Sequence, residues 1–372
     1  MLNDEIMESA YLAWLASARI PADSLLKLLD MYNSGESVYR AVRSGNPQIQ
    51  ETVPPGALTT LRRNAAPDTI RMFSERISSH QIRAMTIHDP KFPCILRDIE
   101  DPVSILFYQG NTACLTGRII GMVGSRQASY AGLKAAQRIA RDLSREGVSV
   151  ISGFAYGIDS ASHRGCIEGG SPTIAVMGCG LDIDYPADNA ELRRTALEGN
   201  GLFLSEYAPG EKPLAGNFPY RNRIISALGA ALILMEAKIR SGSLRTVDHA
   251  LKQGKDIFVY PGDPESLHFE GNHQLLRDGG RYFTTARDVL EDLDWLDKKP
   301  GVVQNSGCSG SPAADSPAEE RIMQILRPGA LSFEQLAAKS MLTPAELLSL
   351  LTILQVRGMI EPLPGKKYQM KQ

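Results

Sequence analysis

The feature that most constrains the fold is the alternation of short β-rich runs with helical runs between residues 103 and 284. This alternation is typical of a parallel sheet flanked by helices. A crossover helix is expected over 130–146, where the apolar residues share one face and Gly147 closes the run. The sequence therefore predicts an α/β fold with a mainly parallel sheet. The expected strands are Ile119–Val123, Val148–Ile151, Thr173–Met177, Leu202–Leu204, Ala231–Met235 and Ile257–Tyr260.

Small polar residues follow most of the expected strands. Open α/β sheets bind ligands beyond the carboxyl ends of their strands, and glycines there let backbone amides approach an anion. One such loop would be weak evidence, but five loops at one edge favour an anion site. The loops are Gly124-Ser125-Arg126, the run from Ser152 and Gly153 to Asp159, Gly178-Cys179-Gly180, Arg240-Ser241-Gly242-Ser243 and Pro261-Gly262-Asp263.

The stretch NFPYRNRIIS, residues 217–226, combines charge with aromatic faces. Arg221 and Arg223 offer planar guanidinium groups that suit phosphate, and Asn222 adds an amide. Phe218 and Tyr220 offer faces on which a base would stack. Taken alone, the stretch also fits an ordinary helix start with solvated charges.

The motifs of common nucleotide enzymes do not match these loops. The first loop lacks G-x-G-x-x-G, and the chain has no G-x-x-x-x-G-K-[ST], so no nucleotide cofactor is expected. Residues 118–145 hold six Lys or Arg against one acid, and residues 217–256 hold seven against three. The whole chain has a formal net charge of −2, so the basic surface is local. Two basic blocks on one sheet favour a polyanion as ligand.

Several side chains are candidate catalytic groups. Asp159 and His163 suggest an acid–base pair but also fit a helix contact or cap, and Cys179 fits a small buried thiol better than a nucleophile. The carboxylates Asp182, Asp184 and Glu206 have no neighbouring histidine and are read as solvated or capping groups. We therefore expect no enzymatic activity and no metal site.

The core is flanked by two smaller predicted domains. Residues 1–80 read as a helical head, similar to sterile-alpha-motif or helix-hairpin-helix domains, and residues 81–297 form the core. A flexible linker is expected over 298–317 and a winged-helix domain over 318–372. Its helices are expected at 318–326, 332–339 and 344–357, with Thr343 as a cap and a β wing over 359–370. The third helix would expose little basic charge: Glu346, Ser349, Thr352 and Gln355.

Composition favours a cytoplasmic location. Five cysteines form no C-x-x-C pair, so neither a disulfide framework nor a spaced zinc site is indicated. Asp4, Glu5 and Glu8 stand where a signal peptide would be basic, and the longest apolar run, 224–235, is too short for a bilayer. We expect neither export nor membrane insertion.

Four long motifs resemble the DNA-processing protein A family, also called Smf. They are SGFAYGIDSASHRG (152–165), TIAVMGCGLDIDYPADN (173–189), LSEYAPGEKPLAGNFPYRNRIIS (204–226) and SGSLRTVDHALKQGKDIFVYPGD (241–263). With GMVGSR (121–126) and GNHQLLRDGG (271–280), the resemblance covers roughly residues 90–290.

The resemblance implies a Rossmann-like core that binds single-stranded DNA without catalysis. It further implies a homodimer that protects incoming DNA and loads the RecA recombinase during natural transformation. The chain departs from the family at Arg240, where lysine is usual, and at Arg245, where an aliphatic residue is usual. The DNA-binding residues implied are Gly124, Ser125, Arg126, Ser152, Gly153, Phe218, Arg221, Asn222, Arg223, Arg240, Ser241, Gly242 and Ser243.

Two alternatives remain at this point. A Rossmann-like enzyme of the lysine-decarboxylase-like phosphoribohydrolase type would share the glycine-rich edge, but it would show P-G-G-x-G-T-x-x-E where this chain has Pro261-Gly262-Asp263-Pro264-Glu265. A pure adaptor would use the basic edge to bind protein only. Release of a free base would support the first alternative, and failure to bind single strands at low salt would support the second.

Overall fold

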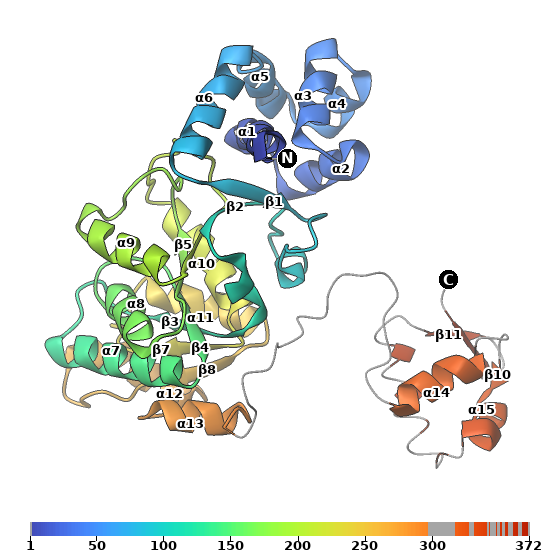
Figure 1. Cartoon of the computed structure of the whole chain (residues 1–372). Helices are drawn as coiled ribbons and strands as arrows, with labels where there is room; N and C mark the ends of the chain where they lie inside the picture. The colour runs from blue at the N-terminus through green and yellow to red at the C-terminus, as the bar shows by residue number, and fades with distance from the viewer. Residues whose placement is uncertain are drawn as a thin grey trace. The chain divides into compact units, whose positions relative to one another are not determined.

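The computed structural model describes residues 2–296 and, beyond them, 317–326, 331–340, 360–363, 367–370 and a few single positions between 342 and 355. The chain forms two compact units, Met1–Gly307 and Cys308–Gln372 (Figure 1). The finer boundaries predicted at residues 80, 297 and 317 remain proposals. No helix in the described ranges is both long and apolar enough to cross a membrane.

The first unit begins with a helical head, as predicted. Its apolar side chains, among them Trp14, Leu15, Leu28 and Leu29, are fully buried, so the helices pack around one core. Local caps define their ends; the Ser34 hydroxyl, for example, accepts a hydrogen bond from the Ser37 amide. The helices are α1 (Leu2–Ser17), α2 (Ala22–Tyr32), α3 (Gly35–Ser44), α4 (Pro47–Thr52), α5 (Pro55–Arg63) and α6 (Pro67–Ser79).

A nine-stranded sheet follows, in the order β1-β2-β6-β5-β4-β3-β7-β8-β9. Pairing is parallel from β6 to β9, whereas β1 and β2 pair antiparallel at the other edge, so the predicted mainly parallel sheet is confirmed. The strands are β1 (Arg83–Thr86), β2 (Ile105–Gly110), β3 (Arg118–Val123), β4 (Val148–Ser152), β5 (Ile174–Met177), β6 (Leu202–Ser205), β7 (Ala231–Leu234), β8 (Asp256–Val259) and β9 (Arg281–Tyr282).

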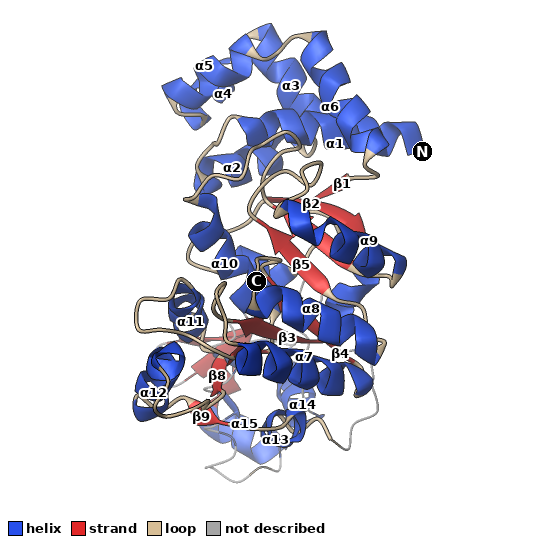
Figure 2. Cartoon of the chain, turned by 90° about the vertical axis from the view of Figure 1, so that its left-hand side faces the viewer, coloured by secondary structure: helices blue, strands red, loops and turns tan. Residues whose placement is uncertain are grey.

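Helices cover both faces of this sheet, as Figure 2 shows. Successive side chains of a strand point to opposite faces, and β3 follows this rule. Its Ile119 packs in the cluster that contains α10 and α11, whereas Ile120 packs in the cluster that contains α7, α8 and α13. The helices are α7 (Tyr130–Arg145), α8 (Ile158–Gly169), α9 (Ala190–Glu198), α10 (Asn217–Leu228), α11 (Ser243–Lys252), α12 (Glu270–Arg277) and α13 (Ala286–Asp292). Short 3₁₀ helices span Cys94–Arg97, Thr112–Thr116, Ala187–Asn189 and Leu267–Phe269.

The second unit has its own small core, formed by residues such as Ile322, Leu336 and Leu354. Its described elements are α14 (Pro317–Leu326), β10 (Leu331–Ser332), α15 (Phe333–Ser340), β11 (Ile360–Leu363) and β12 (Lys367–Met370). β12 pairs antiparallel with both β10 and β11, which agrees with the predicted β wing. The predicted linker and most of the predicted third helix, with Thr343, Glu346, Ser349 and Thr352, lie outside the described residues.

Candidate nucleic-acid interface

A groove of about 740 Å³ lies at the carboxyl edge of the sheet. The chain runs from β3 outward to β4, β5 and β6, then returns to add β7 on the other side of β3. The ends of β3 and β7 therefore flank the point where the strand order reverses, which is where open α/β sheets bind ligands. The groove is lined by the loop after β3, by 238–246 after β7 and by the start of α10.

Several helices begin at this edge. Helices α7, α8, α10 and α11 each follow a strand, β3, β4, β6 and β7 respectively, so their first turns lie at the carboxyl end of the sheet. The first turn of a helix carries unpaired N–H groups and the positive end of the helix dipole. The backbone alone therefore favours an anion here.

Cationic side chains add to this field. Arg126, Lys238 and Arg240 line the groove and are exposed, and Arg221 lies at its base. The one acidic residue among the lining residues is Asp159, which is buried. The groove therefore carries a net positive charge although the chain as a whole does not.

Arg221 is held rigidly by the groove floor. Its Nη1 donates a hydrogen bond of 2.9 Å to the carbonyl oxygen of Gly153, and its Nε donates one of 3.2 Å to Asn222 Oδ1. Burial lowers the pKa of Arg221 to about 10, and the attraction of Asp159 opposes this shift. Burial likewise raises the pKa of Asp159, against the attraction of Arg221. At neutral pH Arg221 therefore remains charged, with a carboxyl group beside it.

Gly153 provides the space for that arrangement. A Cβ atom at this position would lie 2.7 Å from Arg221 Nη2 and 2.8 Å from Asp159 Oδ2. At these distances a side chain at position 153 would force Arg221 or Asp159 to move. Gly153 was expected to contact DNA, but it does not line the groove; the geometry gives it the role of admitting Arg221.

The ring of Phe218 lies close to two guanidinium groups. The Cζ atoms of Arg126 and Arg221 lie 5.3 and 5.9 Å from its centroid, and the Tyr185 ring lies 5.2 Å from it. Gly178 leaves room for this ring, since a Cβ there would be 2.8 Å from it. Phe218 is partly exposed in the groove beside the cations, so its ring remains a candidate surface for base stacking.

The structure separates Arg223 from Arg221. Arg223 is buried, its Nη2 lies 2.7 Å from Glu206 Oε1, and its Nε donates to the carbonyl oxygen of Asp101. It does not line the groove, so the expectation that both arginines share one phosphate-binding edge does not match this geometry. The contacts give Arg223 a structural role in joining α10 to the segments before β2 and after β6.

Ser152 and Tyr220 also lie away from the groove. Ser152 is fully buried, and its hydroxyl donates to the carbonyl oxygen of Met122, which ties β4 to β3. Tyr220 faces the other side of α10, with the Arg223 guanidinium 3.9 Å from its ring centroid. The remaining ten expected residues meet in the groove: Gly124, Ser125, Arg126, Phe218, Arg221, Asn222, Arg240, Ser241, Gly242 and Ser243.

Two residues of the groove and its support were not predicted from the sequence. Lys238 lines the groove, and a lysine just after an expected strand was the available signal. Glu236 is fully buried and accepts hydrogen bonds from the Ser129 amide and hydroxyl, while its carbonyl oxygen accepts one of 2.7 Å from the Ser125 amide. Glu236 thereby fixes the loop after β3 to the loop after β7.

The candidate catalytic side chains His163 and Cys179 are buried in the protein core. His163 is fully buried, burial lowers its pKa to about 3, and its Nδ1 lies 2.7 Å from Thr173 Oγ1. Cys179 is fully buried with a pKa raised to about 11, so the buried-thiol interpretation is confirmed. Among the described residues no cluster of acids, histidines and cysteines could hold a metal ion.

The acids considered as metal ligands are engaged elsewhere. Asp182 accepts a hydrogen bond from the Gly210 amide and pairs with Arg76, and Asp184 pairs with Arg193. Glu206 pairs with Arg223, as described above. These carboxylates are therefore paired or capping groups. The sequence predicted solvated or capping roles for them but not the ion pairs.

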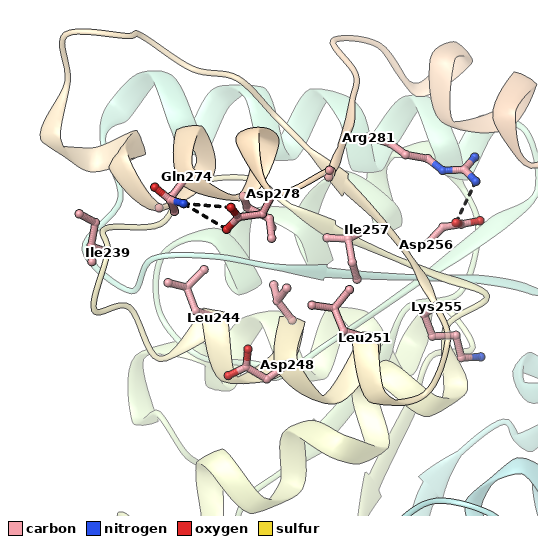
Figure 3. A pocket seen from close by; sticks show the side chains of 15 residues that line it. Ile239, Leu244, Asp248, Leu251, Lys255, Asp256, Ile257, Gln274, Asp278 and Arg281 are labelled. Carbon is pink, nitrogen blue, oxygen red and sulfur yellow. Dashed lines mark hydrogen bonds and ion pairs between the residues drawn. The ribbon is translucent and has the colours of Figure 1, made fainter.

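A second cavity, of about 610 Å³, lies between α11, α12 and β8 (Figure 3). Its walls include the apolar Leu244, Leu251 and Ile257. Three acids line it against two cations, and Asp256 is paired with Arg281 at 2.9 Å. This charge disfavours a polyanion, so the basic groove is the better candidate for nucleic acid.

Comparisons with known proteins agree with this architecture. Residues 83–294 match the family model of DNA recombination-mediator protein A, and residues 309–366 match that of the DprA winged helix domain. The DNA processing protein DprA of Streptococcus pneumoniae is 40% identical over 212 residues, covering 57% of this chain and 74% of that protein. Protein Smf of Synechocystis is 29% identical over 328 residues, covering 80% of this chain and 82% of that protein.

Solved structures give the same result. The structure of DNA processing protein A from S. pneumoniae superposes with a TM-score of 0.63 at 32% identity, covering 76% of this chain and 97% of that chain. DNA processing protein A from Helicobacter pylori, studied for its single-stranded DNA binding mode, superposes with a TM-score of 0.51 at 28% identity, covering 56% and 95%. The fold predicted from the sequence, a Rossmann-like core with a helical head and a winged-helix domain, is thus confirmed. The chain belongs to the DNA recombination-mediator protein A family.

Proposed function

We propose that this protein binds single-stranded DNA in the groove between the ends of β3 and β7. The observation that carries the proposal is the meeting of Arg126, Arg221, Lys238 and Arg240 in one groove with the partly exposed ring of Phe218. The cations neutralise phosphates, and the ring stacks on an unpaired base. The H. pylori relative, studied for its single-stranded DNA binding mode, supports this assignment.

The proposed contacts follow from the groove. The loop after β3 and the loop after β7 supply amides, hydroxyls and charges, and α10 supplies Phe218, Arg221 and Asn222. The loops and α10 are supported in these positions by Gly153, Ser152 and Arg223, which do not contact the DNA themselves. The full set of proposed contacts is Gly124, Ser125, Arg126, Phe218, Arg221, Asn222, Lys238, Arg240, Ser241, Gly242 and Ser243.

We further propose that the protein acts without catalysis, as a cytoplasmic homodimer. It would protect incoming DNA and load the RecA recombinase on it during natural transformation. Membership of a recombination-mediator family supports this role, because such a protein must hold DNA without altering it. The burial of His163 and Cys179 supports the absence of catalysis, since neither side chain can reach a substrate in the groove.

Binding to single-stranded and double-stranded DNA of one sequence, measured across a salt series, tests the proposal. We expect preferential binding of the single strand and an affinity that falls as salt rises. Equal affinity for both forms would refute the single-strand assignment, and failure to bind at low salt would favour a protein-binding adaptor. Incubation with nucleoside monophosphates tests the enzymatic alternative: release of a free base would overturn the non-catalytic proposal.

A further inference from the structure

A cavity of about 520 Å³ lies between the helical head and the core, on the side of α10 opposite the groove. The head contributes the end of α1 and the start of α2, and the core contributes residues around β2 and after β6. A cavity of this size accommodates a small organic group. The residues used below are Ala22, Ser104, Glu206, Glu211, Gly216 and Tyr220.

Two hidden polar atoms at this cavity lack partners. Ser104 is 3% exposed, and its hydroxyl has no hydrogen-bond partner among the described residues. Oε2 of Glu206 is likewise shielded from solvent and without a partner there. Buried polar groups are almost always hydrogen-bonded, because an unmet group costs about 1–3 kcal/mol. At the wall of the cavity a hydroxyl and a carboxylate oxygen therefore lack partners, and a small rotation of each side chain would let them bind a ligand that offers both a donor and an acceptor.

The charges of the cavity are balanced within the protein. Glu206 pairs with Arg223 at 2.7 Å, and Glu211 pairs with Arg19. A cationic side chain or a phosphate would disturb this balance. The other walls include Ile20, Pro21 and several further apolar residues. These walls suit a neutral, flat, partly polar group.

The start of α10 borders both the cavity and the groove. Gly216 and Tyr220 line both the cavity and a shallow hollow beside α11, and Pro219 lines both that hollow and the groove. The hollow also carries Arg245, which suits the backbone of a strand that leaves the groove. Asp248 and Lys252 line the hollow as well, and Lys252 is paired with Glu100 at 2.8 Å. Nucleobases on such a strand would pass the exposed ring of Tyr220.

We propose that the cavity between head and core receives one unpaired base of the bound strand and contacts its Watson–Crick edge. This proposal rests on the proposed function. Each of the four bases offers a donor beside an acceptor on that edge, so Ser104 and Glu206 would accept any base. In a duplex the same edge is occupied by the complementary base. The cavity therefore selects single strands over duplexes without reading their sequence.

The test compares two short oligonucleotides, one of thymidine and one in which every thymine is methylated at N3. The methyl group blocks the Watson–Crick edge but leaves the phosphates and ring faces in place. Every base is modified, so the strand cannot avoid the change by sliding. We expect the full-length protein to bind the methylated strand at least about fivefold more weakly, which is the lower limit for loss of one base contact.

Variants locate the effect. Ala22→Trp fills the cavity from the start of α2 and should bind both strands equally, at the level of the methylated strand. Thr59→Trp, exposed on α5 of the same head, is the matched control and should behave as the unchanged protein. Ser104→Ala removes an unpartnered hydroxyl, so it should leave the thermal melt unchanged while reducing the preference.

Equal binding of both strands by the unchanged protein would overturn this inference while leaving the proposed function intact. A preference that persists in both Ala22→Trp and Ser104→Ala would also overturn it. If the unmodified strand failed to bind at low salt, the proposed function itself would fail. The three results are distinguishable in one titration series.

Discussion

Replacing Arg240 by alanine should remove one phosphate contact and nothing else. Arg240 is exposed at the groove, in the loop between β7 and α11, and no ion-pair partner is present among the described residues. Exposed substitutions of this kind change stability by about 0.5 kcal/mol or less. The effect on DNA should therefore appear without unfolding.

The magnitude follows from the number of exposed cations. Arg126, Lys238 and Arg240 reach the solvent side of the groove, whereas Arg221 is buried at its base beside Asp159 and is not counted. Each neutralised phosphate contributes roughly 0.7 to the slope of log affinity against log salt. For these cations the total is about 2.1, so affinity should fall roughly 18-fold between about 50 and about 200 mM salt. With Arg240→Ala the slope should be about 1.4 and the fall roughly sevenfold.

Fluorescence anisotropy of a labelled single strand, titrated at several salt concentrations, measures both slopes. Arg71→Ala is the matched control, because Arg71 is an exposed arginine of α6 far along the chain from the groove. It should leave the slope unchanged. A slope for Arg240→Ala equal to that of the unchanged protein, in a variant with an unchanged melt, would show that Arg240 makes no phosphate contact.

Four further outcomes are expected. Arg223→Ala should lower the free energy of unfolding by about 3–5 kcal/mol, because it leaves the Glu206 carboxylate unpaired. Denaturant titration measures this loss. A small loss of stability combined with a flatter salt slope would show instead that Arg223 contacts DNA. Phe218→Ala should weaken binding by roughly 1–3 kcal/mol with little change in salt slope, and a changed slope would argue against stacking. A chain ending at Asp297 should keep most of its single-strand affinity, because the groove lies within residues 123–246; loss of binding by a folded core would place the site elsewhere. Stability should fall as pH decreases from about 6.5 towards about 3, because unfolding lets His163 take up a proton that the buried ring excludes. His163→Gln should show a smaller loss between pH 7 and pH 5 in denaturant titrations, and an equal loss would assign the effect to other groups.

The sequence predicted the central strands well but missed the edges of the sheet. Strands β3 to β8 are buried, β-rich and separated by helices, so their pattern is clear. β1 has four residues and β9 has two, and neither gives a periodic signal. β2 is an apolar run that fits a strand, but its antiparallel pairing with β6 depends on tertiary contacts.

The sequence predicted which residues form the candidate site better than it predicted the direction of their side chains. Arg221 and Arg223 look equivalent in a loop, but both lie on α10, where residues two apart point about 200° from each other. One therefore faces the groove and the other faces Glu206. Ser152 was placed at the right strand end, yet the end of β4 is buried under its neighbours. Side-chain direction at an element's end depends on where that element stops, which sequence patterns locate poorly.

The close packing of Gly153, Asp159 and Arg221 has an evolutionary consequence. A methyl group at position 153 would force the guanidinium of Arg221 or the carboxyl of Asp159 to shift, and loss of Asp159 would leave a buried positive charge without its counter-ion. A single substitution at any of the three positions therefore disturbs the other two. Descendants of this chain should keep all three residues or exchange them together, so that related sequences would show these positions as one inherited unit.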